Sequence, residues 1–467
     1  MRLPVPSGGE RWLALALLLT LPLANPYPRG EGNGHYAYLP SLVIDHDLQF
    51  DDEYRHGDPD FLNSTFRRAD AQPWPPLRMP TGYLRNPQAV GAALLWAPAF
   101  LQAHALMLVL RALGLPVDAD GYGLAYRAAV ATASAVMGML ALLLAHRAAR
   151  RVVGGFAALA AVAALWLASP LPVYMYFLPF YGHAPAAFVA ALFLWYWLAR
   201  RPLGGPTQWA TWGAIGGLLF ATDHLAALLL VAMAFEGVSA LRRLGPGAAG
   251  CDLVAGAAGL LLGALPELAV KAILHGSPLR SGRLNRFFWT SPQWSEVGFS
   301  SQHGLFVWTP VLLLGVIGLL LLLRRPGQRA VAAALLATFG LTYFVVACYE
   351  AWHGASSFGN RFFVPLTAAF ALGLATLVDD VLAALRGRVP ARAAQAALAG
   401  GLALLAAWNL GFVFQWGSGM VPRQGPVDLR VVARNQVQAV PQRVAGFALR
   451  YLRARGEVSG RQEGGPR

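Results

Sequence analysis

The sequence predicts an all-α polytopic membrane protein with about 11 transmembrane helices, in a range of roughly 10 to 13. Hydrophobic residues make up 56% of the 467 residues, and charged residues only 13%, which is about half the usual share. A water-soluble domain could not bury this much apolar surface, and a disordered chain would be poorer in Leu, Val and Phe. The composition therefore excludes a soluble enzyme and favours a bundle of helices in a bilayer.

Long apolar runs mark the expected transmembrane spans. Several of them approach the ~20 residues that a helix needs to cross about 30 Å of hydrocarbon. A further run over 87–110 contains Pro87, Pro98, Gln102 and His104, and we expect it to lie on or dip into the outer leaflet without crossing. The eleven expected spans are 12–25, 122–146, 155–172, 184–199, 207–222, 224–241, 252–274, 304–323, 330–349, 361–385 and 393–416.

Five short basic clusters set the expected orientation, because loops rich in Lys and Arg stay on the cytoplasmic side. Two spans, or one run able to fold as a hairpin, separate each cluster from the next. We therefore expect all five clusters to lie inside together with the N-terminus, which carries Arg2 and Arg11, and the C-terminus to lie outside. Many of the arginines behind the net charge of +14 then mark the orientation of the chain in the membrane, and no nucleic-acid partner is expected. The clusters are Arg147/Arg150/Arg151, Arg200/Arg201, Arg242/Arg243, Arg324/Arg325/Arg329 and Arg386/Arg388/Arg392.

The first outer loop carries the expected catalytic carboxylates. In this orientation residues 26–121 form a long loop outside, with the transmembrane domain covering 1–416 and an Arg-rich tail covering 417–467. Tyr36, Tyr38 and Leu39 suit an amphipathic juxtamembrane helix lying on the membrane surface. A carboxylate is the usual group that takes a proton from an attacking hydroxyl, or it is simply solvated. The catalytic candidates are Glu31, Asp45 and Asp47.

Arginines, histidines and an asparagine of the outer loops, together with an arginine near the outer end of the span 122–146, supply candidate ligands for a phosphate or substrate. Arg361 begins a helix at the end of the segment YEAWHGASSFGNRFFVPL, where a guanidinium could hold a lipid phosphate or simply snorkel to the interface. Asp45 and Asp47, together with His46, could also bind a divalent cation, which is the one cofactor that the residues leave open. The binding candidates are Arg85, Arg127, Arg286, His353, Asn360, Arg361 and His183.

Glu267 and Lys271 lie four residues apart on one expected span, near its outer end. They are interpreted as an internal ion pair, because a charged group within a membrane helix usually has a partner.

The arrangement of these features resembles the GT-C glycosyltransferases. The resemblance rests on a first span followed by an acidic residue, amphipathic helices, a Pro-bearing segment near 87, a span with an early Arg over 126–151 and the exit Ser169-Pro170. The strings HGLFVWTPVLLLGVIGLL and WHGASSFGNRFFVPL resemble bacterial relatives of the protein O-mannosyltransferases and the lipid A aminoarabinose transferases. The likeness runs over most of residues 10–416.

This resemblance implies a hexosyl or pentosyl transferase of the bacterial inner membrane, active at the outer (periplasmic) face. The donor would be a sugar on a polyprenyl phosphate, and the acceptor a lipid, a glycan or a protein, with membrane lipids as further partners. A carboxylate, Glu31 with Asp45 or Asp47, would deprotonate the acceptor. Arginines such as Arg85 and Arg361 would stabilise the departing phosphate. Two alternatives stay open: a transporter or flippase of envelope precursors, and a non-catalytic partner in an envelope glycan complex.

Overall fold

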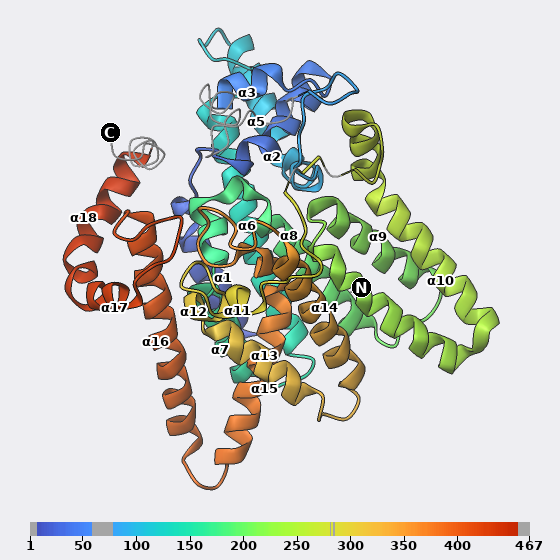
Figure 1. Ribbon diagram of the computed structural model, residues 1–467, viewed down its shortest axis with the longest axis vertical. Coiled ribbons are helices and arrows are strands. Elements are labelled where there is room, and N and C mark those ends of the chain that lie inside the picture. The colour runs from blue at the N-terminus through green and yellow to red at the C-terminus, as the bar shows by residue number, and fades with distance from the viewer. Residues whose placement is uncertain (1–6, 58–77, 281, 284, 456–467) are drawn as a thin grey trace.

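A computed structural model describes residues 7–57, 78–280, 282–283 and 285–455. The expectations for Arg2, for residues 58–77 of the first outer loop and for the tail beyond 455 concern residues outside these ranges. The described chain is built from helices, and it contains two isolated β-bridges and no strand. The helices (Figure 1) are α1 Gly8–Leu19, α2 Glu31–Pro40, α3 Asp51–Gly57, α5 Gly91–Ala112, α6 Leu124–Ala149, α7 Gly155–Ala168, α8 His183–Arg200, α9 Pro206–Thr222, α10 Val231–His275, α11 Trp294–Phe299, α12 Leu305–Trp308, α13 Val311–Leu322, α14 Arg329–Cys348, α15 Thr367–Leu385, α16 Ala391–Gly417, α17 Leu429–Gln438 and α18 Val440–Arg453.

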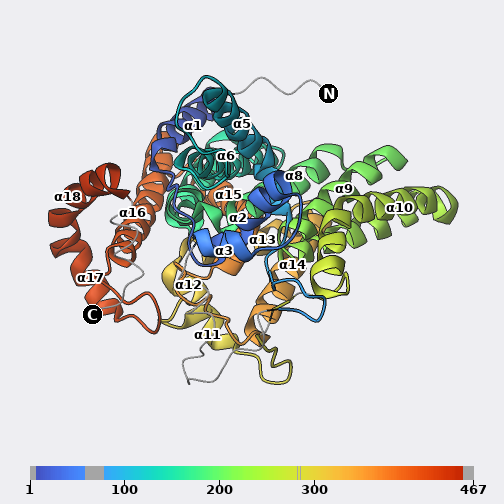
Figure 2. The ribbon, with the colours of Figure 1, turned by 90° about the horizontal axis from the view of Figure 1, so that it is seen from above.

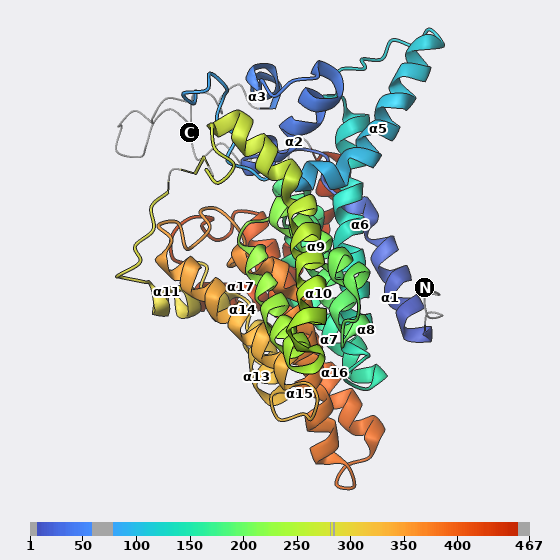
Figure 3. The ribbon, with the colours of Figure 1, turned by 90° about the vertical axis from the view of Figure 1, so that its right-hand side faces the viewer.

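Helices occupy all of the expected spans, and the prediction of an all-α polytopic membrane protein is confirmed. Six helical segments of the described chain are long and apolar enough to cross a membrane: α5, α6, 226–275, α14, 361–385 and α16. The apolar helices α7 and α13 are shorter. α5 runs obliquely at the same end of the molecule as α2 and α3 (Figure 3). Since its length would also let it cross, its expected place at the outer surface stays a prediction.

The basic clusters meet at one end of the bundle, as the sequence predicts. The Arg325 guanidinium donates to the carbonyl of Val152, at 3.3 Å, and to Asp379, at 2.9 Å, so it joins the end of α6 to the end of α15. Arg386 and the rest of its cluster follow in the turn between α15 and α16, which extends beyond the rest of this end (Figure 1).

Two more contacts bring the remaining clusters to this basic end. Arg201 donates to the carbonyl of Gly327, at 3.1 Å, and to the carboxylate of Glu236, at 3.0 Å. Arg243 donates to the carbonyl of Leu203, at 2.7 Å. The end of α8, the first half of α10 and the loop after α13 are therefore tied together through arginines, which agrees with the expectation that the clusters lie on one side.

Glycines let α9 approach the second half of α10 closely. A Cβ added at Gly213 would collide with the carbonyl of Gly256, and one at Gly217 with the carbonyl of Leu260. Small residues at such spacing allow helix backbones to pack tightly in membranes. α10 itself turns at Gly245, whose φ of 76° interrupts the helix, so the expected spans 224–241 and 252–274 are separated by a turn.

α2 is enclosed by protein, although the sequence predicted a helix lying on the membrane surface. Tyr36 and Tyr38 are buried, and their hydroxyls donate to the carbonyls of Gly121, at 2.6 Å, and Gln88, at 3.0 Å. Seen from above (Figure 2), α2 and α3 lie across the end of the bundle, and α17 and α18 curve along one side. The apolar residues that suggested a membrane face instead pack on the bundle and hold α2 there.

Candidate functional site

A cavity of about 550 Å³ opens at the end of the bundle away from the basic clusters. α8 connects the two ends, since it begins at His183 in the cavity lining and ends at Arg200 in a basic cluster. Seven chain segments contribute to the cavity. They are the start of α2 with His35, residues 88–89, 181–183 and 222–228, the loop residues Arg283, Asn285 and Phe287, and the segments 345–349 and 361–362.

An ion pair between Glu31 and Arg361 lies in this cavity. The Glu31 Oε1 is 2.6 Å from the Arg361 Nη2, and the Arg361 side chain is 8% exposed whereas that of Glu31 is 32% exposed. The guanidinium also lies 5.5 Å from the centre of the Tyr181 ring and 5.6 Å from that of Phe362. Planar stacking and a carboxylate partner together hold the Arg361 guanidinium in one position. The cavity thus presents a fixed cation and a partly accessible carboxylate side by side.

The charge of Glu31 is set by two opposing effects. Burial raises the pKa of Glu31, but Arg361, Arg283 and His183 together outweigh burial and bring this pKa down to about 2, with Arg361 contributing most. Glu31 is therefore ionised at neutral pH. Its backbone geometry is demanding, because Gly30 just before it has φ of 48° and a Cβ there would collide with the Tyr181 hydroxyl.

His183 faces the same cavity and is 7% exposed. Its Nδ1 is 3.9 Å from the Asp223 Oδ2, which is too long for a hydrogen bond. Neither ring nitrogen of His183 has a hydrogen-bond partner among the described residues. Asp223 itself accepts from the amide of Leu225, at 2.9 Å, and so caps the turn after α9. A buried imidazole without partners is suited to binding a polar group of a ligand.

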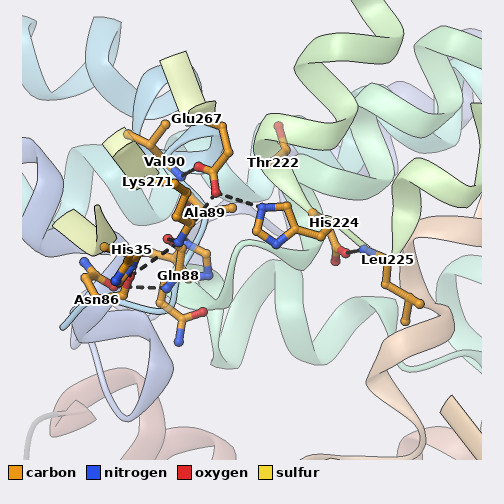
Figure 4. A network of polar contacts seen from close by, with 12 residues as sticks. His35, Asn86, Gln88, Ala89, Val90, Thr222, His224, Leu225, Glu267 and Lys271 are labelled. Carbon is orange, nitrogen blue, oxygen red and sulfur yellow. Dashed lines mark hydrogen bonds and ion pairs between the residues drawn. The ribbon is translucent and has the colours of Figure 1, made fainter. Parts of the chain in front are cut away.

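A buried network fixes the cavity wall over 86–90 (Figure 4). The carboxylate of Glu267 accepts from the amide of Val90, at 2.8 Å, and from His224 Nε2, at 2.7 Å. Lys271 Nζ lies 3.5 Å from Glu267 and donates to the carbonyl of Gln88, at 3.1 Å. The interpretation of Glu267 and Lys271 as an ion pair is confirmed by this distance. The pair also positions the segment that lines the cavity.

His35 supports the same wall from α2. Its Nδ1 donates to the carbonyl of Ala89, at 3.2 Å, and burial lowers the pKa of His35 to about 4, so the ring is neutral at physiological pH. Gly182 lies against its other nitrogen, with φ of 73°. Sequence reasoning missed His35 as a site residue, because nothing near it in the chain distinguishes it from the other histidines of the outer loops.

Asp45 and Asp47 do not line the cavity, although the sequence grouped them with Glu31. Asp47 accepts from the hydroxyl of Ser41, at 3.1 Å, and from the amide of Gln49, at 2.9 Å, so it closes a local turn. Asp45 is exposed on the surface after α2. No group of three or more His, Cys, Asp or Glu side chains in the described ranges is placed to hold a metal ion, and this includes Asp45 with Asp47 and their neighbour His46.

Three of the predicted arginines lie away from the cavity lining. Arg85 precedes the lining segment, and its Nη1 is buried without a hydrogen-bond partner among the described residues. Arg127 packs its guanidinium 5.1 Å from the ring centre of Tyr27. Arg286 contributes a backbone amide, which donates to the carboxylate of Glu350 at 3.0 Å. Among the four predicted arginines, Arg361 is the one that lines the cavity.

His353 and Asn360 shape the loop that leads to Arg361. The His353 Nδ1 accepts from the amide of Ala355, at 3.1 Å. Asn360 is fully buried, and its amide donates to the carbonyl of Trp352, at 3.2 Å. Both side chains therefore stabilise the backbone of the loop that places Arg361 in the cavity. Neither of them contributes to the cavity lining.

Arg283 lines the cavity in place of the predicted Arg286. Residues around 287 run beside Tyr349, with a β-bridge between Phe287 and Tyr349. Side chains alternate between the two sides of an extended segment, so Arg283, Asn285 and Phe287 share the cavity side and Arg286 does not. The sequence shows that this loop is rich in basic and aromatic residues. Which of them face the cavity depends on how the loop pairs with the distant segment around Tyr349, and the sequence does not reveal this pairing.

Comparisons with known proteins found a likeness among solved structures. No protein-family model matches the chain, and no curated protein matches it. Among solved structures, ArnT from Cupriavidus metallidurans, crystallised bound to undecaprenyl phosphate, is similar at 14% identity with a TM-score of 0.44. The alignment covers 95% of this chain and 75% of that chain.

Proposed function

We propose that this protein is a membrane glycosyltransferase that moves a sugar from a polyprenyl-phosphate donor to an acceptor hydroxyl. The observation that carries the proposal is the Glu31–Arg361 pair in a cavity at one end of a transmembrane bundle. A carboxylate beside a fixed guanidinium meets the two needs of the reaction, a base for the acceptor and a cation for the leaving phosphate. In a bacterial inner membrane the cavity would open to the periplasmic face.

In the proposed reaction the acceptor oxygen attacks the anomeric carbon, and the bond from that carbon to the phosphate oxygen breaks. The acceptor proton passes to Glu31, and polyprenyl phosphate leaves with the bonding electron pair. Arg361 and Arg283, which both line the cavity, would stabilise the negative charge that develops on the phosphate. His183 and Asp223 would bind hydroxyl groups of the sugar.

Donor binding would also make Glu31 a better base. In the free protein Arg361, Arg283 and His183 together hold the pKa of Glu31 at about 2 against the effect of burial, and a carboxylate with so low a pKa accepts a proton poorly. A phosphate bound by Arg361 adds a negative charge beside Glu31 and offsets the guanidinium. The pKa of Glu31 would then rise, since a nearby like charge disfavours ionisation.

The experiment is a transfer assay with the purified chain in liposomes. Undecaprenyl-phosphate donors bearing different radiolabelled sugars are supplied with a bacterial envelope extract as the source of acceptors. The proposal predicts transfer of the label to an acceptor and a stoichiometric release of undecaprenyl phosphate. Movement of the intact donor between leaflets without release would contradict it and favour the transporter alternative. The non-catalytic alternative predicts neither outcome unless a second enzyme is added.

A further inference from the structure

A second cavity, of about 260 Å³, lies between α16, α18 and the segment before α2. One wall is the outer part of α16 and the other is a face of α18, with Phe177 and Leu178 between them. The rings of Phe414 and Phe447 meet edge to face across this crevice, 5.3 Å apart. Most of its lining is apolar and includes Leu410 and Phe414 of α16 and Val444, Phe447, Ala448 and Leu452 of α18.

Specific contacts hold α18 in place at the crevice. The Tyr451 hydroxyl donates to the carbonyl of Leu23, at 3.0 Å, and Arg455 donates to the carbonyl of Ala24, at 2.7 Å. The Tyr451 ring also packs edge to face on Phe177, with ring centres 5.5 Å apart. The crevice is therefore bounded by an anchored helix, although Val444 and Leu452 on its lining face stay 42% and 50% exposed.

The surroundings of the crevice are strongly positive. Residues 429–455 contain six arginines and no acidic residue, and α17 and α18 lie within this stretch. Arg29 and Arg423 belong to the crevice lining itself. The Arg423 guanidinium stacks on Trp416, 5.2 Å from the ring centre. A basic amphipathic helix beside an apolar crevice matches an amphiphile with apolar chains and a negative head group.

We propose that this crevice binds an anionic glycerophospholipid, with an acyl chain in the apolar cleft and the phosphate beside Arg29 and Arg423. Segments 25–31 and 177–183 form a wall between the crevice and the cavity of Glu31, because Arg29 and Leu178 line the former while Glu31 and His183 line the latter. A phosphate at Arg29 is thus on the far side of this wall from Arg361. The site is separate from the cavity assigned to the sugar donor, and it explains why a tail rich in arginine sits at the end away from the other basic clusters.

Native mass spectrometry of the full chain in a neutral detergent tests this proposal. The protein is titrated with dioleoyl phosphatidylglycerol and, separately, with dioleoyl phosphatidylcholine. We expect one phosphatidylglycerol to be retained per chain at concentrations about tenfold below those needed for phosphatidylcholine. Equal retention of the two lipids would overturn the proposal, and so would displacement of phosphatidylglycerol by an equimolar amount of undecaprenyl phosphate.

Matched variants locate the site. Leu410→Trp fills the crevice from α16, whereas Leu404→Trp changes an exposed residue of the same helix that is not in the lining. The first should abolish the retained lipid and the second should not. If Leu410→Trp is not monodisperse, Ala448→Trp fills the crevice from α18 instead. Retention of phosphatidylglycerol by a well-folded crevice-filling variant would overturn the assignment.

Charge variants separate the head-group contact from the acyl-chain contact. Arg29→Gln and Arg423→Gln should each lower the preference for phosphatidylglycerol about fivefold. Arg434→Gln, on the exposed part of α17 outside the lining, should change it much less. Equal effects of all three substitutions would show a diffuse attraction to anionic lipid and would contradict a site at Arg29 and Arg423.

Discussion

The two ends of the bundle use charged side chains in different ways. At the basic end, Arg325 and Arg201 donate to the carbonyls of neighbouring turns and to buried or half-buried acids. At the other end, Glu31, Arg361 and His183 meet in a cavity, and His183 has no hydrogen-bond partner in the described part of the chain. Arginines at the basic end connect helices, whereas charged groups at the cavity end are arranged around space for a ligand. The predictions below separate the two roles.

Apart from changes at Glu31 itself, removing Arg361 should have the largest effect on the proposed reaction. Arg361→Gln deletes the guanidinium that would stabilise the leaving phosphate, and loss of one such group typically lowers kcat by a factor of about 10²–10³. Initial rates of sugar transfer in liposomes would measure this loss. Arg201→Gln at the basic end is the control, and its specific activity per folded molecule should stay within about twofold of the wild type. Equal losses of activity in both variants would contradict the view that charged side chains have different roles at the two ends of the bundle.

The same variant should change the pH dependence of kcat/KM for the donor, which reports the free enzyme. Glu31 must be ionised to accept a proton, so the rate is lost as pH falls through the pKa of Glu31, about 2 in the wild type. The wild type should therefore show no loss from Glu31 between pH 4 and 8. Arg361→Gln removes the largest of the effects that lower this pKa, while Arg283 still lowers it and burial still raises it. The acid limb of the variant should therefore lie at a higher pH than that of the wild type. An acid limb near pH 4.5 in the wild type that Glu31→Asp shifts would contradict this account.

Glu236→Ala should lower stability more than activity. Glu236 is 1% exposed and accepts from Arg201, at 3.0 Å, and from the Trp197 indole, at 3.0 Å. Removing the carboxylate leaves a cation and an indole without their partner, and breaking such a buried pair costs about 3–5 kcal/mol. Thermal unfolding in detergent would show the loss. An unchanged unfolding temperature would mean that the basic end does not depend on this pair.

His183→Ala should lower the transfer rate about tenfold, less than Arg361→Gln, because it removes one uncharged hydrogen bond to substrate. The loss should appear mainly in KM if His183 binds the sugar in both ground and transition states. Since His183 is 7% exposed, thermal unfolding of the variant serves as the control for a packing defect. Wild-type kinetics in this variant would show that His183 does not bind the substrate.

Asp379→Asn should have the smallest effect. Asp379 is 34% exposed and shares Arg325 with Asp380, and such exposed pairs contribute at most about 1 kcal/mol. Unfolding and transfer rates should both stay close to those of the wild type. A large loss of stability would mean that the Arg325 contacts are a principal tie between α6 and α15.

The helices could be predicted from the sequence because bilayer thickness and the sidedness of arginine constrain apolar runs directly. The turn at Gly245, the break at Asp223 and the common end of the basic clusters all follow from those constraints. The enclosure of α2 could not be predicted, since Tyr36 and Tyr38 suit a membrane surface and a protein interior equally well.

The candidate site was predicted only in part. Glu31 and Arg361 are 330 positions apart in the chain, and each was selected for its residue type and its place after a span. Asp45 and Asp47 seemed equivalent to Glu31 in the sequence, but only Glu31 begins the helix that enters the cavity. Arg283 was missed because the side of an extended segment depends on its pairing with Tyr349. Contacts between distant segments decide these points.

The most direct test of the central claim compares Glu31→Gln with Asp47→Asn in the liposome transfer assay. Both substitutions replace a carboxylate by an amide of similar shape in the first outer loop. Glu31→Gln should lower the rate by about 10²–10⁴, as expected for loss of a general base, while Asp47→Asn, outside the cavity, should keep most of it. Full activity in Glu31→Gln, or a loss in Asp47→Asn that matches it, would contradict a reaction centred on the cavity.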